Sequence, residues 1–289
     1  MPELPEVEVV KRSLNNKIQN SIVKAVKIKD SNLRYKVNKN HIKKIIGRKI
    51  KKILRRSKYL LFYFSKDIIM LVHLGMTGKF FYKNKNNEKQ KTSFYYDINY
   101  KKDKKYNRII FNLSNNQKLI YNDVRKFGFI KFSNELNINQ NLHLKKLGPE
   151  PLSKNFNFYY FKKYVIGRNR STKDILMDQK FVAGLGNIYV NEILFLSGVK
   201  PTKKITLLSE LEMNKIIKFT KKILSKAIKL GGSSIKNFSS SSGKKGSYQQ
   251  HFYVYGKKGE YCSNKNCNER INKIVLANRA SFYCAKCQK

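Results

Sequence analysis

The sequence predicts an α+β protein of two or three folded units: a β-sandwich or flattened barrel behind an opening helix, a helical region, and a small metal-bound β-hairpin. Three observations support this. The 289 residues are about twice the length of a typical single domain. Short apolar runs before residue 135 give way to helical spacing after residue 155. All four cysteines lie between Cys262 and Cys287, close to the C-terminus.

The composition is that of a globular and very basic chain. With 62 Lys and Arg against 18 Asp and Glu, the net charge is +44 at pH 7, while 41% of the residues are hydrophobic and 12% aromatic. These values exclude a disordered chain and a small disulfide scaffold. Such a charge favours nucleic acid over an anionic membrane or an acidic protein as the partner. AT-rich codon drift also explains many lysines, so charge alone does not decide.

The sequence predicts a cytoplasmic protein that does not contact a membrane. No apolar run approaches the roughly 20 residues that a membrane-spanning helix needs. The N-terminus carries Glu3, Glu6 and Glu8 where a secretory signal would have basic residues followed by an apolar stretch.

The first element is a predicted amphipathic helix that begins near Leu4. Pro5 is tolerated in a first helical turn, and the three glutamates suit the positive end of the helix dipole. Apolar residues then recur at helical spacing, namely Leu4, Val7, Val10 and Leu14.

Eight short runs rich in β-branched and aromatic residues follow, which indicates a β-sandwich or flattened barrel. The Lys- and Asn-rich stretch 83–91 between two of them has no apolar period and is predicted to be a solvated hairpin loop. The predicted strands are Ile22–Ile28, Leu60–Phe64, Ile68–Val72, Lys79–Tyr82, Ser93–Ile98, Arg108–Leu113, Lys118–Tyr121 and Gly128–Phe132.

Helices are predicted after the Gly-Pro-Glu-Pro hinge at 148–151. The clearest starts with a capping box between Ser209 and Glu212 and ends at Gly231-Gly232. A Ser-, Gly- and Lys-rich stretch after Phe238 is predicted to be a mobile loop. The predicted domains are a helix plus β-sandwich (2–135), a linker (136–155), a helical domain (156–237), the mobile loop (238–250) and a cysteine hairpin (251–289).

The cysteines are spaced C-x4-C and C-x2-C, which suits two thiolate pairs at the tips of two turns. We expect them to bind one structural Zn²⁺, because four protein ligands leave no position for a catalytic water. Arg279 lies between the pairs on this metal-fixed support and is suited to binding a phosphate. The predicted ligands are Cys262, Cys267, Cys284 and Cys287.

The N-terminus is a candidate nucleophile. If Met1 is removed, Pro2 offers a secondary amine with a pKa of about 8, which can condense with a sugar C1′ to an iminium. Glu3 is adjacent and Glu6 lies one turn further on, so a carboxylate could move the protons of the elimination that follows. The alternative is that these glutamates only stabilise the start of the helix.

Eight motifs, in order and across essentially the whole chain, resemble bacterial formamidopyrimidine-DNA glycosylases. The resemblance implies an N-terminal β-sandwich, a helix-two-turn-helix domain and a C-terminal zinc-finger β-hairpin. The first cysteine pair departs from the usual C-x2-C of that family. The motifs are MPELPEVE, RRSKYLLF, HLGMTGKF, YNDVRKFGF, HLKKLGPEPL, LMDQKFVAGLGNIYVNEILF, YVYGKKGEYC and NRASFYCAKCQK.

The resemblance assigns catalytic roles to four residues by position. Pro2 matches the Schiff-base nucleophile and Glu3 the principal proton donor and acceptor, with Glu6 in a supporting role. Lys58 matches the lysine that assists elimination and contacts DNA. Arg279 matches the zinc-finger arginine that binds the phosphate next to the lesion and is assigned to δ-elimination.

The resemblance also assigns DNA contacts. Asn187 matches a phosphate ligand at the helix-two-turn-helix tip. Met76, Arg125 and Phe127 match the side chains that fill the space left by the flipped-out base, although Met76 and Phe127 read alone would be core residues.

Two DNA-contacting positions depart from the family pattern. The usual histidine is replaced by Tyr106, with Arg108 two residues later. The usual lysine falls on Asn169, with candidate replacements at Arg168, Arg170 and Lys173.

The resemblance therefore implies a monomeric, bifunctional DNA glycosylase and abasic-site lyase of base excision repair. Its substrate would be double-stranded DNA containing 8-oxoguanine or formamidopyrimidines, cleaved by β,δ-elimination. Two alternatives stay open. One is an endonuclease VIII-type enzyme for oxidised pyrimidines, although that branch usually begins MPEGPE. The other is a zinc-finger DNA-binding protein without catalysis.

Overall fold

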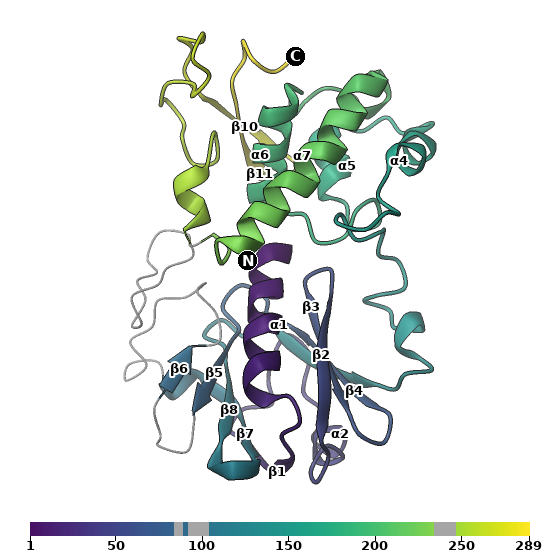
Figure 1. Ribbon diagram of the computed structural model, residues 1–289, viewed down its shortest axis with the longest axis vertical. Coiled ribbons are helices and arrows are strands. Elements are labelled where there is room, and N and C mark those ends of the chain that lie inside the picture. The colour runs from purple at the N-terminus through teal and green to yellow at the C-terminus, as the bar shows by residue number, and fades with distance from the viewer. Residues whose placement is uncertain (84–88, 92–103, 234–246) are drawn as a thin grey trace. The chain divides into compact units, whose positions relative to one another are not determined.

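The computed structural model describes residues 1–83, 89–91, 104–233 and 247–289 (Figure 1). The chain divides into two compact units. The first unit is Met1–Lys145 with Leu230–Ser247, and the second is Lys146–Lys229 with Tyr248–Lys289. Within the described residues, no helix is long and apolar enough to cross a membrane.

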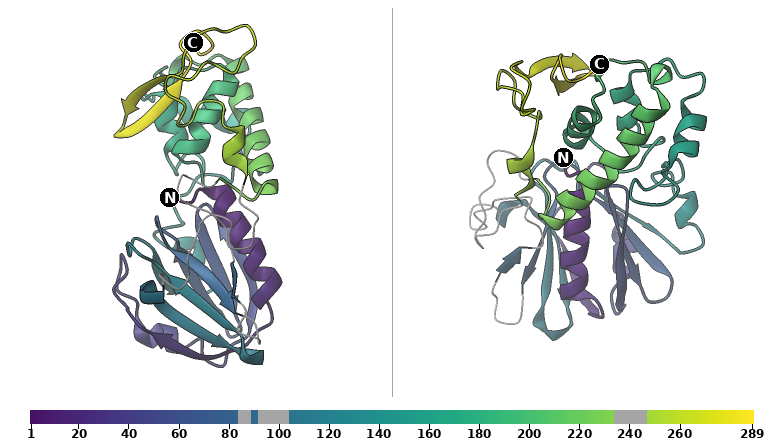
Figure 2. Two further views of the ribbon diagram at one scale, coloured as in Figure 1. Left: turned by 90° about the vertical axis from the view of Figure 1, so that its left-hand side faces the viewer. Right: turned by 45° about the horizontal axis from the view of Figure 1, so that its top comes forward.

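The first unit combines helix α1 (Leu4–Ile18) with two antiparallel sheets (Figures 1 and 2). One sheet has the strand order β1-β7-β8-β5-β6 and the other β2-β3-β4-β9. A short helix α2 (Lys39–Lys43) and 3₁₀ turns lie in the connections, namely η1 (Lys104–Tyr106), η2 (Ser114–Asn116) and η3 (Ile138–Gln140). The strands are β1 (Val23–Ile28), β2 (Ile50–Arg56), β3 (Tyr59–Phe64), β4 (Ile68–His73), β5 (Lys79–Lys83), β6 (Lys89–Lys91), β7 (Asn107–Leu113), β8 (Lys118–Asn122) and β9 (Phe129–Ser133).

The core of this unit is formed by the alternating apolar residues of both sheets together with one face of α1. On β7, Ile109, Phe111 and Leu113 face this core, whereas the residues between them face away from it. Helix α1 contributes Val7, Val10, Leu14 and Ile18, as its helical spacing predicts.

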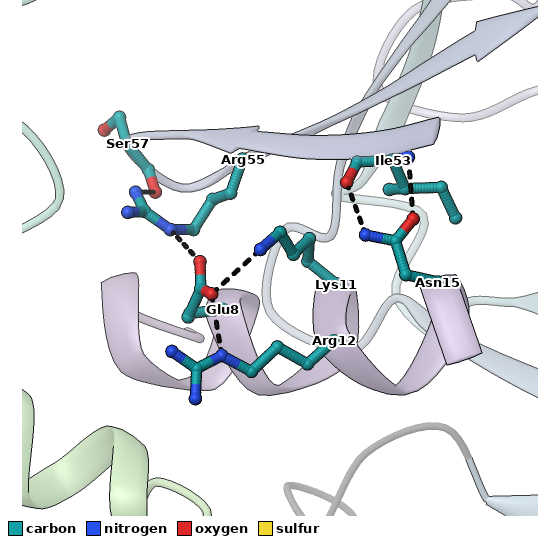
Figure 3. Close-up of polar contacts among 7 residues, drawn as sticks. All are labelled: Glu8, Lys11, Arg12, Asn15, Ile53, Arg55 and Ser57. Atoms are coloured by element: carbon teal, nitrogen blue, oxygen red, sulfur yellow. Dashed lines mark hydrogen bonds and ion pairs between the residues drawn. The ribbon is translucent and has the colours of Figure 1, made fainter. Parts of the chain in front are cut away.

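Helix α1 is joined to β2 by polar contacts as well as by apolar packing (Figure 3). The side-chain amide of Asn15 donates to the carbonyl of Ile53 at 2.9 Å and accepts from the backbone N–H of Ile53 at 2.8 Å. One side chain therefore occupies both backbone groups of a strand residue and fixes the helix against the sheet.

Most predicted strands are present, with two differences. Strand β2 was not predicted, because its apolar residues Ile50, Ile53 and Leu54 are dispersed among lysines and arginines. The predicted loop 83–91 is wrong at its ends, since Lys83 closes β5 and Lys89–Lys91 form β6. The predicted strand Ser93–Ile98 lies outside the described residues.

The second unit contains four α-helices and one β-hairpin among its described residues: α4 (Phe158–Val165), α5 (Thr172–Met177), α6 (Asn187–Ser197), α7 (Glu210–Lys229), β10 (Asn272–Leu276) and β11 (Arg279–Tyr283). The 3₁₀ turns η4 (Ile205–Leu207) and η5 (Tyr248–His251) complete it. Helix α6 is buried on nearly every side, and α7 packs one apolar face on it. Ser209 and Glu212 form the predicted capping box through bonds of 2.9 and 3.2 Å.

The two units differ from the predicted domain boundaries. They separate between Lys145 and Lys146, inside the predicted linker 136–155, and the second unit contains most of both the predicted helical domain and the predicted cysteine hairpin. Leu230–Ser247 groups with the first unit, although its described start continues directly from α7. The predicted mobile loop 238–250 lies outside the described residues up to 246, and Tyr248–His251 form η5.

Candidate functional site

The start of α1 holds two buried carboxylates. Pro2 is buried in the extended segment before the helix, and Glu3 is its N-cap residue. Glu3 and Glu6 form a reciprocal capping box, in which the Glu3 N–H donates to Oε2 of Glu6 at 2.9 Å. Glu3 is 4% exposed and Glu6 is 2% exposed.

The N-terminal amine in this structure is that of Met1, and it lies among charged groups of both signs. Burial is the main cause that lowers its pKa, and Lys58 and Arg125 lower it further, whereas Glu3 and Glu6 oppose the shift. The structure therefore brings together four of the predicted residues around the N-terminus. A lowered pKa increases the neutral, nucleophilic fraction of an amine at neutral pH.

Glu6 also joins α1 to the segment that follows α7. Its Oε1 accepts from the backbone N–H of Ser233 at 2.8 Å and from the Ser233 hydroxyl at 3.1 Å. Gly232 has a φ of +81°, and a Cβ at this position would lie 2.9 Å from Oε1 of Glu6. A glycine is therefore required where this segment passes the carboxylate.

Lys58 lies in the turn between β2 and β3 and is only 7% exposed. The preceding residue Ser57 is buried with a φ of +55°. Nη1 of Arg55 donates to the Ser57 carbonyl at 2.9 Å, and Nε of Arg55 donates to Oε2 of Glu8 at 2.9 Å (Figure 3). A chain of contacts thus joins α1 to the turn that carries Lys58.

Glu8 receives two further cations on its other oxygen. Oε1 accepts from Nζ of Lys11 at 3.1 Å and from Nε of Arg12 at 2.9 Å (Figure 3). Burial raises the pKa of Glu8, but the hydrogen bonds from Arg12, Lys11 and Arg55 outweigh it and lower the pKa overall. Glu8 is therefore an ionised, largely buried carboxylate that binds three cationic side chains.

Met76 and Phe127 are exposed on two neighbouring loops, at 40% and 44%, and are not core residues. The Arg125 guanidinium lies 4.6 Å from the centre of the Phe127 ring. The loops approach closely at Gly75, where a Cβ would lie 2.4 Å from the backbone N of Gly128. Met76, Arg125 and Phe127, which the resemblance assigns to filling the space left by the flipped-out base, therefore lie on two adjacent loops.

The side chains of His73 and Asp123 hold these two loops in place by accepting hydrogen bonds from loop residues. Nδ1 of His73 accepts from the Gly75 N–H at 3.1 Å, and burial lowers the pKa of His73 to about 4, so the ring is neutral and packs the loop as expected. Asp123 accepts from the Thr77 hydroxyl and from the Gly128 N–H. Thr77 in turn accepts from the backbone N–H of Arg125 at 3.0 Å.

Arg108 supports these loops through contacts inside the fold, and its predicted DNA contact stays a prediction. It is 8% exposed, and its Nε donates to the Asp123 carbonyl at 2.9 Å. Its Nη1 donates to Oδ2 of Asp30 at 2.9 Å. Tyr106 is half-buried beside it, with the Arg108 guanidinium 5.8 Å from its ring centre.

In the second unit, two predicted DNA contacts converge on the backbone of the hairpin. Nζ of Lys173 donates to the Ala280 carbonyl at 2.9 Å, and Nδ2 of Asn187 donates to the same carbonyl at 3.0 Å. Asn191 adds a bond from the Phe282 N–H at 2.7 Å. Arg279 precedes Ala280 and is exposed, so the backbone beside it is fixed while its side chain is available.

Lys173 consequently does not replace the missing family lysine as an exposed contact. It is 1% exposed, and its ammonium also bonds Oγ of Ser281 at 2.7 Å. Asn169 is exposed, whereas Arg170 is paired with Asp174 and Asp178. The guanidinium of Arg168 lies 3.9 Å from the ring centre of Tyr164.

The four cysteines gather at one point, with all Sγ atoms within 4.8 Å of one another. Cys262 and Cys287 are 3.8 Å apart and Cys267 and Cys284 are 3.6 Å apart, measured between Sγ atoms. A tetrahedral zinc site with Zn–S bonds of about 2.3 Å requires sulfur separations of about 3.8 Å. The residues present therefore fit a four-thiolate metal site, including the longer C-x4-C knuckle.

Several organising residues were missed by sequence reasoning. Glu192 is fully buried on α6 and accepts from the backbone N–H groups of Tyr253 (2.7 Å), Val254 (3.0 Å) and Tyr255 (2.8 Å). It holds the chain that leads into the cysteine hairpin. Its signal in the sequence is an acidic residue within the apolar run NEILF, and Asp123 in YNDVRKF is similar.

The fold and these sites define a DNA-processing protein of the DNA glycosylase class. Residues 1–130 match the family model of the "Formamidopyrimidine-DNA glycosylase N-terminal domain", and residues 147–239 match that of the "Formamidopyrimidine-DNA glycosylase H2TH domain". The chain belongs to the formamidopyrimidine-DNA glycosylase family.

Curated and solved relatives extend over the whole chain. The formamidopyrimidine-DNA glycosylase of Rickettsia bellii is 37% identical and that of Ruegeria pomeroyi 34%, each over 100% of both chains. A Lactococcus lactis FPG variant in complex with Fapy-dG-containing DNA has a TM-score of 0.86 at 33% identity, with 100% of both chains covered. A MutM complex with DNA containing carbocyclic 8-oxo-G has a TM-score of 0.85 at 34% identity, also over 100% of both.

Proposed function

We propose that this chain is a bifunctional DNA glycosylase of base excision repair, which excises oxidised purines and then cleaves the strand at the abasic site. The substrates are 8-oxoguanine and formamidopyrimidines in double-stranded DNA. The observation that carries the proposal is the N-terminus of the chain, where Pro2 is buried and the Met1 amine lies within electrostatic reach of Glu3, Glu6, Lys58 and Arg125. The chain also matches solved lesion-DNA complexes over its full length.

The covalent route begins with removal of Met1, which the small Pro2 residue favours. The secondary amine of Pro2 attacks C1′, the bond from C1′ to the base breaks, and the base leaves with a proton. The amine nitrogen loses its proton, and the C1′–O4′ bond then breaks as O4′ takes up a proton. This ring opening gives a cationic iminium, which acidifies the C2′ proton. If Met1 stayed, the Pro2 nitrogen would be an amide without a usable lone pair, and this route would be closed.

Glu3 is the group placed to transfer these protons, because it directly follows Pro2 and its backbone is fixed by the capping box with Glu6. Lys58 lies close enough to the Met1 amine to lower its pKa, and it adds positive charge near the proposed reacting centre. β-Elimination expels the 3′ phosphate, and δ-elimination then expels the 5′ phosphate. For the second step we assign Arg279 as the phosphate-binding group.

DNA recognition uses both units. Met76, Arg125 and Phe127 fill the space that the extruded base leaves, which otherwise costs a few kcal/mol of lost stacking. The exposure of Met76 and Phe127 and the stacking of Arg125 on Phe127 support this role. Arg279 and the amide of Asn187 are proposed phosphate contacts, with Arg168 and Asn169 as further basic and polar contacts near α5.

The cysteine site is proposed to hold one structural Zn²⁺ on Cys262, Cys267, Cys284 and Cys287. Zinc bound by four thiolates supplies no catalytic water and acts only to stabilise the fold. The bacterial relatives support a cytoplasmic location. That the protein acts on chromosomal DNA as a monomer stays a prediction.

A base-release assay tests the function. Purified full-length protein is incubated with duplexes that contain either 8-oxoguanine opposite cytosine or thymine glycol, and the released base is measured by mass spectrometry. We expect release of 8-oxoguanine and little release from thymine glycol. Preference for thymine glycol would indicate the endonuclease VIII-type branch, and tight lesion binding without release would indicate a DNA-binding protein that no longer catalyses.

A further inference from the structure

The first unit has a lysine-lined groove on the face of its five-stranded sheet that points away from the core. The groove has a volume of about 390 Å³. None of the catalytic or void-filling residues lines it. Its lining residues are Lys27, Lys29, Lys83, Lys104, Asn107, Ile110, Asn112, Lys118 and Ile120.

Strand register explains why these residues share one face. Lys27 is paired with Ile110, which is paired with Ile120, so one row crosses β1, β7 and β8. A second row pairs Asn112 with Lys118. The residues between them, such as Phe111 and Leu119, face the core. Alternation therefore separates an apolar inner face from a cationic outer face.

The charge of the groove is of one sign. Lys27, Lys29, Lys104 and Lys118 are exposed, and within the described part of the chain none of them forms an ion pair. Among the residues that the structure describes, no carboxylate lines the groove. Like charges on neighbouring strands destabilise a sheet unless a counter-charge is supplied, so the arrangement suits a bound polyanion.

We propose that this groove binds the phosphate backbone of a second segment of duplex DNA, separate from the duplex engaged at the N-terminal site. Lysine ammonium groups and asparagine amides donate to phosphate oxygens without regard to sequence. Single-stranded nucleic acid would normally require aromatic stacking platforms, and none of the described residues that line the groove is aromatic. Duplex DNA is therefore the favoured occupant. A second contact keeps the enzyme on DNA while the catalytic site releases one segment.

The first experiment counts duplexes bound per full-length chain. A short undamaged duplex is added in excess at low salt, and native mass spectrometry or sedimentation gives the stoichiometry. We expect two duplexes for the unaltered protein and one for the variant Lys27→Gln/Lys29→Gln/Lys118→Gln. The matched control Lys39→Gln/Lys43→Gln/Lys51→Gln removes three exposed lysines of the same unit that do not line the groove, and it should still bind two.

Three outcomes would overturn the proposal: one duplex on the unaltered protein, two on the groove variant, or an equal loss in both triple variants. Circular dichroism establishes that each variant is folded. A single strand of the same length is the competitor, and stronger binding of that strand would exclude duplex as the occupant. This count needs no catalysis, so it stands or falls independently of the proposed glycosylase activity.

The second experiment measures salt dependence with the N-terminal site already occupied. The protein is trapped covalently with borohydride on a short lesion duplex, and a labelled undamaged duplex is then titrated. The titration of the groove variant extends to higher duplex concentrations than the counting experiment, so that its weakened second site is also measured. Because each phosphate contact changes the slope of log K against log salt by about 0.9, this variant should lose about 2.7 of that slope for its three lysines. The control variant should keep the full slope, and an unchanged slope in the groove variant would contradict the assignment.

Discussion

Oε2 of Glu8 lies 2.9 Å from Nε of Arg55, and this ion pair joins the helix that carries the N-terminal nucleophile to the turn that carries Lys58. Both side chains are about one-tenth exposed, at 11% and 10%. Arg55 continues the connection through its bond to the Ser57 carbonyl. The relative position of Pro2 and Lys58 therefore depends on a buried charge pair whose members are not among the residues assigned to catalysis or to DNA contacts.

The first prediction concerns this pair. Breaking a buried ion pair leaves a charge uncompensated and costs about 3–5 kcal/mol of unfolding free energy, so Glu8→Gln should lower stability toward that amount. Arg12→Gln is the matched control, because Arg12 makes an equally short bond to Glu8 but its side chain is 60% exposed. Its cost should be about 0–1 kcal/mol. Urea unfolding followed by circular dichroism measures both, and equal losses would contradict the account.

The second prediction is the pH dependence of that stability. The pKa of Glu8 is lowered below 4.5 in the folded chain, so the unfolded chain binds the proton more readily. The stabilisation is then complete above pH 4.5 and is lost as the pH falls through the lower, folded-state pKa. The stability difference between the unaltered protein and Glu8→Gln should shrink in that window. A stability difference between the two proteins that grows as the pH falls would contradict a lowered pKa for Glu8.

The third prediction concerns Lys173 and the hairpin. Lys173→Met leaves the Ala280 carbonyl with one donor fewer and removes the bond to Ser281, at a cost of about 1–3 kcal/mol. Because Arg279 adjoins Ala280, the ratio of β- to δ-elimination products should rise on a sequencing gel. Lys163→Met changes an exposed lysine of α4 and should alter stability by less than about 0.5 kcal/mol. An unaltered product ratio in Lys173→Met would separate Lys173 from the Arg279 step.

The fourth prediction concerns the cysteine site. Metal analysis should find one zinc per chain, released together with titration of four thiols. Removal of the metal should weaken binding of a lesion duplex by about tenfold or more, because the hairpin loses its fold. The β-sheet signal of the first unit should persist. Metal-free protein that binds the duplex as tightly as before would show that the hairpin folds without zinc.

The sequence predicted those features that depend on local pattern. Runs of β-branched and aromatic residues predicted the strands within 108–121, and cysteine spacing predicted the cluster of four thiols. Strand β2 was not predicted because its few apolar residues are interspersed with lysines and arginines, a pattern typical of a solvent-exposed segment. In the structure, Arg55 is buried because it forms an ion pair with Glu8. No local pattern indicates a partner 47 residues away.

Lys173 and Arg108 illustrate the same limit at the site. In a chain of +44 charge, any lysine or arginine near a motif is a candidate DNA contact. Burial distinguishes Lys173 and Arg108 from the exposed basic residues. The Lys173 ammonium donates to a backbone carbonyl, and the Arg108 guanidinium donates to a backbone carbonyl and to Asp30. Only tertiary packing shows that they position Arg279 and the Arg125 loop.

The central claim is that the N-terminal amine of mature Pro2 forms a Schiff base with lesion DNA, and borohydride trapping tests it most directly. The protein is incubated with an 8-oxoguanine duplex and borohydride, beside Pro2→Gly, and its intact mass is recorded. We expect a protein that lacks Met1, a covalent adduct on the lesion strand, and a much weaker adduct with the variant. An active, trappable enzyme that retains Met1 would contradict the Pro2 mechanism.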